Sequence, residues 1–242
     1  MEYKPKVLII HSSPRRYGAS SQLAEIAGIG VNDAGGLVER IFLYDYNIKP
    51  CIGCVSDGIA YCRFPCIIRD DDFNYVANKI MEADGLIIAT PVYWYAPSGI
   101  LKNVLDRLTS MENMIFHKSK SLLEGKVAGF IATGLDSGVM TSIAYLMAVL
   151  NSMGVIIPPW SMAYSHVEEI VKDENALRDA YNVGYLVTEA LKALKAYDKP
   201  LGYKPDIEVK KLTETLKNYS VTKSSEREIR LKLLNSLLDQ NR

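Results

Sequence analysis

Four cysteines form the most reactive group of side chains in this sequence. Cys51, Cys54, Cys62 and Cys66 fall within sixteen consecutive residues, and the chain contains no other cysteine. Four thiolates in one loop can ligate a 4Fe–4S cluster or a tetrahedral zinc ion. In a cytosolic protein such clustering favours a metal or cluster site, although disulfides persist in the cytosol of hyperthermophiles. The loop therefore predicts a metal or cluster site, with disulfides or free thiols as the alternative.

A second group of polar residues starts near the N-terminus. His11-Ser12-Ser13-Pro14-Arg15-Arg16-Tyr17-Gly18 follows an apolar run and precedes an amphipathic helix. Hydroxyl groups, free backbone N–H groups at a helix start and a basic residue together form a cradle for phosphate. An ordinary helix cap by Ser20 or Ser21 is the alternative. Because the segment matches neither the dinucleotide fingerprint nor the Walker A motif, it predicts a monophosphate ligand.

Two further loops carry residues suited to a flat ligand. Tyr93, Trp94 and Tyr95 stand between Pro91 and Pro97, and the prolines stiffen the segment. Such a loop suits a partly apolar ring system, and the same aromatics would also serve a dimer contact. The third loop is Thr133-Gly134-Leu135-Asp136-Ser137-Gly138. Its glycines allow a ligand edge to approach the backbone closely, although the same string would also make an ordinary turn.

These loops need a scaffold, and the apolar pattern along the chain supplies one. Five strand-like runs each precede a helical pattern. This alternation predicts an α/β fold with a doubly wound five-stranded parallel sheet in the order 2-1-3-4-5. In such a fold ligands bind outside the carboxyl ends of strands one, three and four, where the three loops fall. The predicted strands are 7–10, 37–43, 85–89, 127–132 and 155–158, and the predicted helices are 23–31, 73–81, 100–108, 139–150 and 176–194.

The composition restricts the classes of partner. The chain has 242 residues with 28 Lys and Arg balanced by 28 Asp and Glu, so no overall field favours nucleic acid or anionic lipid. No apolar stretch reaches the ~20 residues of a membrane span, and no signal peptide is apparent, so a cytoplasmic location is expected. We expect no nucleic-acid or membrane partner.

The C-terminal part of the chain differs from the rest. Residues 1–196 are expected to form the main domain, with the cysteine-rich loop at 50–72. Residues 197–242 are expected to be a linker followed by a helical C-terminal extension of one or two amphipathic helices. This extension is expected to make a dimer contact or to strap across the domain, with a mobile tail as the alternative. Its apolar residues at helical intervals are Leu212, Leu216, Ile229, Leu231, Leu234, Leu237 and Leu238.

At these motifs the chain resembles the flavodoxin-like NAD(P)H-dependent FMN reductases, and among them the iron–sulfur flavoproteins. The resemblance covers roughly residues 5–195. It rests on Ser13-Pro14-Arg15 with Gly18 and Ser20, on Pro91-Val92-Tyr93-Trp94 with Leu101-Lys102-Asn103 and Asp106-Arg107, and on Pro50-Cys51-Ile52-Gly53-Cys54.

The resemblance implies a role for each loop. The first loop would hold the FMN phosphate, the second would contact the isoalloxazine ring, and the third would close over the polar edge of the ring. The implied cofactor-binding residues are Ser13, Pro14, Arg15, Gly18, Ser20 and Ser21, then Pro91, Val92, Tyr93 and Trp94, then Thr133, Gly134, Asp136 and Gly138. Ser12 and Ala19 depart from the glycine and asparagine common in the family.

The resemblance also implies a function. NAD(P)H would reduce FMN, and electrons would pass to a small-molecule acceptor such as a quinone, a flavin, a nitro compound or a ferric chelate. A ferredoxin-like protein is a further expected partner, and a homodimer or homotetramer is the expected assembly. No general base is required, and none of His11, His117 and His166 is assigned a catalytic role. An FMN electron carrier without nicotinamide activity and a non-catalytic module with a zinc- or disulfide-stapled loop are the alternative functions.

The cysteine loop fits the iron–sulfur flavoproteins incompletely. Cys51 and Cys54 have the spacing of that family, and Cys66 before Ile67-Ile68-Arg69-Asp70-Asp71 resembles its last cysteine. Asp57 stands where the family has its third cysteine, and Cys62 comes later. A 4Fe–4S cluster on the four cysteines therefore stays an expectation beside the zinc and thiol alternatives.

Overall fold

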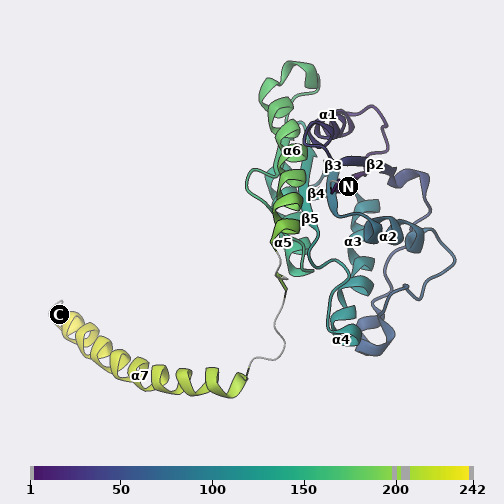
Figure 1. The fold of residues 1–242 in the computed structure, drawn as a ribbon. Helices are drawn as coiled ribbons and strands as arrows, with labels where there is room; N and C mark the ends of the chain where they lie inside the picture. The colour runs from purple at the N-terminus through teal and green to yellow at the C-terminus, as the bar shows by residue number, and fades with distance from the viewer. Residues whose placement is uncertain (1–2, 198–200, 203–207, 240–242) are drawn as a thin grey trace. The chain divides into compact units, whose positions relative to one another are not determined.

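The computed structural model describes residues 3–197, 201–202 and 208–239. Contacts between residues divide the chain into a first unit, residues 1–203, and a second unit, residues 204–242 (Figure 1). The first unit holds the sheet and the three predicted loops. The two units are described separately below.

A parallel sheet forms the centre of the first unit. Its strands are β1 (Lys6–His11), β2 (Leu37–Phe42), β3 (Gly85–Tyr93), β5 (Val127–Thr133) and β6 (Met162–Ser165), and they lie in the order β2-β1-β3-β5-β6. A two-residue strand, β4 (Ala96–Pro97), pairs antiparallel with the end of β3. When the parallel strands alone are numbered, this is the predicted order 2-1-3-4-5. The predicted fold class is confirmed.

Helices cover both faces of this sheet. Alternate residues of β1 point to opposite faces, so that Val7 and Ile9 pack with one helix layer while Leu8 and Ile10 pack with the other. The first layer is α1 (Ala19–Asp33) and α6 (Glu174–Ala196). The second layer is α2 (Phe73–Glu82), α3 (Gly99–Glu112) and α5 (Val139–Ser152), and a short α4 (Met114–Lys118) follows α3.

The last strand is displaced from its predicted position. The apolar run 155–158 predicts a strand, but the structure places β6 at Met162–Ser165 and leaves Ile156 in a single bridge to Val127. Pro158 and Pro159 come two and three residues after Ile156, and proline has no N–H group to continue a ladder. The regular ladder with β5 therefore starts only after the two prolines.

Two glycines bring α1 and α6 into very close contact. A Cβ atom at Gly184 would lie 1.8 Å from the Ala27 carbonyl oxygen, and one at Gly30 would lie 2.1 Å from the Tyr181 carbonyl oxygen. The backbones of the two helices thus touch without side chains between them. The contact lies in the second half of α1, so it fixes this helix, whose first residue follows the first predicted loop.

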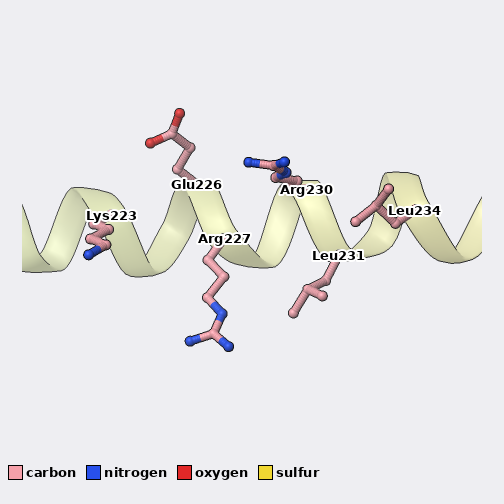
Figure 2. Close-up of a pocket in the computed structure, with 6 residues that line it drawn as sticks. All are labelled: Lys223, Glu226, Arg227, Arg230, Leu231 and Leu234. Atoms are coloured by element: carbon pink, nitrogen blue, oxygen red, sulfur yellow. The ribbon is translucent and has the colours of Figure 1, made fainter. Parts of the chain in front are cut away.

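The described part of the second unit is a single helix, α7 (Val209–Asp239). Leu212, Leu216 and Ile229 are among its exposed apolar side chains. The side chains of Leu237 and Leu238, and most of the predicted linker, lie outside the described residues. Figure 2 shows Arg227 and Leu231 on one side of α7 and Glu226 on the other. A shallow groove on this helix is lined by Lys223, Glu226, Arg227, Arg230, Leu231 and Leu234.

Among the described residues, no helix combines the length and the apolarity that a membrane span needs.

Candidate functional site

The three predicted loops emerge side by side at the carboxyl edge of the sheet. In the strand register His11 lies beside Ala89, and Pro91 lies beside Thr133. Ser12 ties the first two loops together, because its backbone N–H and its hydroxyl both donate to the Ala89 carbonyl, at 2.9 and 3.0 Å. The residues that the motifs single out therefore meet at one edge.

The first loop ends at a helix start that no side chain caps among the described residues. Gly18 is the N-cap of α1, and its backbone N–H donates to the Arg15 carbonyl at 3.0 Å. The Ser13 hydroxyl accepts from the Arg15 N–H at 3.0 Å. Ser20 and Ser21 are buried in the first turn instead of capping it, so the serine-cap alternative does not describe this structure. Uncapped N–H groups at a helix start suit an anion.

The side chains of this loop divide into buried hydroxyls and exposed groups. Ser13, Ser20 and Ser21 are buried, whereas Pro14 and Arg15 are exposed. The exposed arginine can reach an incoming anion, and the buried hydroxyls hold the turn. The loop therefore has the electrostatic features of a monophosphate cradle.

The second loop is a tight aromatic hairpin between β3 and β4. Trp94 and Tyr95 have φ values of 51° and 66°, which is the geometry of a two-residue turn with both central residues left-handed. Large side chains rarely adopt this conformation, and each instance costs of the order of 1 kcal/mol. The Trp94 side chain is 93% exposed at the tip. The hairpin thus holds large rings in solvent at the site edge.

The base of the hairpin is fixed by Thr90, which is fully buried. Its hydroxyl donates to the Pro91 carbonyl at 2.9 Å and accepts from the Ser98 N–H at 3.1 Å. Pro91 and Val92 are partly buried, and Tyr93 is exposed. Helix α3 starts directly after Ser98, so the hairpin and this helix are connected through one buried hydroxyl.

The third loop packs against the hairpin at Gly138. This glycine has φ 87°, and a Cβ atom there would lie 2.7 Å from the Tyr95 Cα. A Cβ atom at Gly134 would similarly lie 3.3 Å from the Val92 Cβ. Thr133 is buried, and Asp136 is exposed with its Oδ1 accepting from the Ser137 N–H at 2.7 Å. The second and third loops thus form one continuous wall.

Sequence reasoning missed Tyr44, which follows β2 in a short 3-10 helix (Leu43–Asp45). The pKa of its hydroxyl is raised, first by burial and then by the neighbouring Tyr93. Tyr44 therefore lies close enough to Tyr93 of the hairpin to interact with it electrostatically. An aromatic residue at the carboxyl end of strand two was the available signal, but the strand-end rule directs attention to strands one, three and four.

His11, at the end of β1, is enclosed behind the first loop. Its ring stacks on Phe42 with centroids 4.2 Å apart, and neither ring nitrogen has a hydrogen-bond partner among the described residues. A Glu25 oxygen lies 3.6 Å from Nε2, yet burial outweighs this attraction and lowers the pKa of His11 to about 4. The histidine is therefore neutral at pH 7, in agreement with a structural role.

This burial predicts a pH dependence of stability. Between about pH 6.5 and pH 4 the unfolded chain binds a proton at residue 11 that the folded chain does not, so the free energy of unfolding falls as the pH falls. The full loss corresponds to about 3 kcal/mol at most. Urea unfolding at pH 7 and pH 4.5 should show a smaller decrease for His11→Phe than for the natural chain. Equal decreases in both proteins would contradict the assignment.

The cysteine loop lies between β2 and α2. Cys51 is exposed, Cys54 is half-buried, Cys62 and Cys66 are buried, and none is in a disulfide. The pKa of the Cys62 thiol is raised to about 12, first by burial and then by Cys54, with smaller effects of Cys51 and Cys66. The other three thiols therefore lie within electrostatic reach of Cys62.

Four sulfur donors fit an iron–sulfur cluster or a soft metal ion chemically. Within the described ranges, however, no three His, Cys, Asp or Glu side chains are grouped closely enough to hold a metal ion. The structure thus shows an open loop with the right donors.

The second half of the loop is fastened to α3 and to the residues that follow it. Asn113 donates from Nδ2 to the carbonyls of Ile59 and Cys62, at 3.0 and 2.5 Å. Arg107 forms a completely buried ion pair with Asp71, and its Nη2 lies 3.5 Å from the Cys66 sulfur. Neither Asn113 nor Asp71 was predicted as a site residue. Their partners lie far apart in sequence, so the sequence offered no spacing signal for them.

Comparison with known proteins identifies a family and a fold for this chain. The profile of the family described as NADPH-dependent FMN reductase matches residues 5–169. An iron-sulfur flavoprotein of Archaeoglobus fulgidus is 28% identical over 88% of this chain and 92% of its own. Iron-sulfur flavoprotein MJ1083 of Methanocaldococcus jannaschii is 30% identical over 78% of this chain and 99% of its own. The crystal structure of RosB with a bound riboflavin-5'-phosphate intermediate superposes with a TM-score of 0.69, 18% identity and coverage of 89% of this chain and 87% of that chain.

Proposed function

Since this chain belongs to the family of NADPH-dependent FMN reductases, we propose that it takes electrons from NAD(P)H and passes them through FMN to a small acceptor. The chain is an FMN oxidoreductase by family, and the nicotinamide donor and the acceptor are the proposed parts. One observation carries the proposal. The uncapped start of α1, the aromatic hairpin and the Gly134–Gly138 wall meet at one sheet edge.

The residues of the three loops have distinct parts in this proposal. The α1 N-terminus with Ser13 and Arg15 would hold the phosphate, and the hairpin would hold the ring system. Gly134 and Gly138 leave room for the polar ring edge near the backbone. When bound, FMN supplies hydride acceptance and electron transfer. The protein binds and orients the two ring systems and excludes water between them.

The acceptor site is the exposed aromatic rim. Trp94 and Tyr95 present rings to solvent beside the proposed flavin position. Planar acceptors such as quinones, flavins and nitro compounds stack on such rings, whereas a ferric chelate gains less from them. The rim therefore favours the aromatic acceptors among those that the family resemblance implies.

The direct test is rapid mixing with nicotinamide. Anaerobic mixing of the FMN-loaded protein with NADPH or NADH should bleach the flavin absorbance, and a quinone added next should restore it. Flavin that neither nucleotide bleaches would overturn the enzyme assignment and favour an electron carrier. Protein that does not bind added FMN at all would favour a non-catalytic module.

We further propose that the four cysteines hold an iron–sulfur cluster. The support is the sulfur donor set and the names of the two archaeal relatives. When bound, a cluster supplies one-electron transfer. Protein reconstituted anaerobically with ferrous iron and sulfide should contain both in cluster ratio. Zinc retained through purification, or a Cys54–Cys62 disulfide found by mass spectrometry, would replace this assignment.

The partners and assembly follow from the same proposal. A ferredoxin-like protein would exchange electrons at the exposed Cys51 side of the loop, and the apolar face of α7 offers a contact for a homodimer or homotetramer. Light scattering on the full chain measures the assembly. A monomer in solution would contradict the expected oligomer.

Gly138 provides a prediction specific to the flavin wall. Gly138→Ala places a methyl group against Tyr95 and should weaken FMN binding about tenfold, because the hairpin must shift. Gly125→Ala is the matched control, since Gly125 has a similar φ of 85° but no atom within 4 Å of a built Cβ. Fluorescence titration of FMN into apoprotein should separate the two variants. Equal affinities would contradict the proposed position of the ring edge.

A further inference from the structure

Arg107 is the largest fully buried side chain among the described residues of the first unit, and it contacts a carboxylate and an aromatic ring. Its guanidinium pairs with Asp71 through both nitrogens of the fork, and neither side chain of the pair is exposed. The same group lies over the Phe73 ring, 4.1 Å from its centroid. A buried ion pair with these contacts is fixed in one position.

Both terminal nitrogens of Arg107 also point into the cysteine loop and its flank, whereas its Nε has no hydrogen-bond partner among the described residues. Nη1 donates to the Lys49 carbonyl at 3.3 Å, just before the loop. Nη2 donates to the Ile68 carbonyl at 3.1 Å and lies 3.5 Å from the Cys66 sulfur. The Arg107 side chain on α3 therefore hydrogen-bonds to the backbone on both sides of the loop and contacts the Cys66 sulfur.

A second residue, Asn74, holds the backbone of Cys66. The Asn74 side chain accepts from the Cys66 N–H at 2.8 Å and donates to the Cys66 carbonyl at 3.1 Å. The backbone of Cys66 is thus satisfied by Asn74 while its sulfur faces Arg107. No comparable contact is described for Cys51, whose sulfur accepts only from the nearby Gly53 N–H at 3.4 Å.

The two halves of the loop therefore differ. The described hydrogen bonds of residues 51–58 stay within residues 51–61. Residues 59–72 are bonded to α2, α3 and the segment after α3 by Asn74, Arg107 and Asn113. Cys66 lies in the half that is bonded to the helices, whereas Cys51 and Cys54 lie in the half whose described hydrogen bonds reach no farther than Tyr61.

We propose that Arg107 is a positioning residue for Cys66. It holds the Cys66 sulfur in one place, and residues 51–58 close onto this sulfur when the loop binds its ligand. The ligand class is a thiophilic iron–sulfur unit or soft cation, so this inference rests on the proposed function of the loop. Arg107 acts through Cys66 and through the Ile68 and Lys49 carbonyls, as residues behind a metal ligand do.

Helix α3 connects Arg107 to the aromatic hairpin. It begins at the Thr90–Ser98 hydrogen bond under the aromatic hairpin, and it carries Arg107 two turns later. The fixed sulfur and the proposed flavin wall are therefore held by the same rigid element.

The test uses the full chain loaded with FMN and free of metal, under argon. Iodoacetamide labelling of each cysteine is followed by mass spectrometry. Arg107→Lys keeps a charge for Asp71 but cannot form the fork. In this variant iodoacetamide should label Cys66 about tenfold faster than in the natural chain, while the labelling rate of Cys62 stays within about twofold. After reconstitution the variant should retain about one tenth of the iron and sulfide of the natural chain.

Asn113→Ala is the matched control, because it removes the fastening of Cys62 and leaves Cys66 untouched. It should accelerate labelling of Cys62 and not of Cys66. If Arg107→Lys does not fold, the double variant Asp71→Leu, Arg107→Met removes both charges together and carries the same expectation.

Two results would overturn the proposal. Unchanged labelling of Cys66 in a folded variant would show that Arg107 does not hold its sulfur. Equal acceleration at all four cysteines would show that Arg107 only maintains the fold of the loop. Both readouts are independent of flavin bleaching by NADPH, so failure of this inference and failure of the proposed reductase activity are distinguishable.

Discussion

Asp71→Asn is expected to lower the free energy of unfolding by about 3–5 kcal/mol, because it leaves the buried Arg107 guanidinium without a counter-charge. Although burial alone would raise the pKa of Asp71, hydrogen bonds from Arg107 and from the Lys49 N–H lower it. The carboxylate is therefore charged at pH 7 and completes the pair. Urea unfolding followed by far-ultraviolet circular dichroism measures the loss.

The neighbouring residue supplies the control. Asp70 pairs with Lys49 in solvent, and such exposed pairs contribute little, so Asp70→Asn should leave the unfolding midpoint almost unchanged. Equal effects of the two substitutions would contradict the buried-pair assignment.

The pH dependence distinguishes the same pair from a packing effect. Because the folded pKa of Asp71 lies below its ordinary value of 3.8, its contribution is complete above that value and is lost as the pH falls through the folded pKa. The difference between the natural chain and Asp71→Asn should therefore shrink in strong acid. A difference that stays constant with pH would assign the loss to packing.

Gly184→Ala is expected to destabilise the first unit by about 3 kcal/mol. The added methyl group would lie 1.8 Å from the Ala27 carbonyl oxygen and 3.0 Å from the Val31 nitrogen, and both are backbone atoms that cannot turn aside. Alanine gains at most about 1 kcal/mol over glycine in helix propensity, so the clash outweighs the gain. Because α1 must move, FMN affinity should fall together with stability.

Gly99→Ala separates the clash from propensity. Gly99 opens α3, and a Cβ atom there meets nothing within 4 Å. This substitution should be neutral or slightly stabilising in the same urea unfolding experiment. A neutral Gly184→Ala would show that α1 and α6 can separate freely, contrary to the close contact.

The sequence by itself determined the order of the parallel strands and the places of the three predicted loops, although it misplaced the last strand. Buried parallel strands need continuous apolar runs such as Leu86–Ala89, and the end of each run marks the edge where ligands bind. The serine-rich first loop, the aromatic hairpin and the Gly134–Gly138 loop follow such runs directly. Local chemistry and chain order are therefore enough to place these loops on one edge.

Only the tertiary structure decided how that edge and the cysteine loop are assembled. From the sequence Gly138 is compatible with an ordinary turn, and only the structure shows the Tyr95 Cα 2.7 Å from where its Cβ would be. Likewise the sequence allows Ser20 to cap α1, and only the structure shows that Gly18 is the N-cap. Asp71 and Arg107 are 36 residues apart, and no spacing pattern joins them. Burial of a charge depends on what packs around it, and that is a property of segments brought together by folding, not of any one of them.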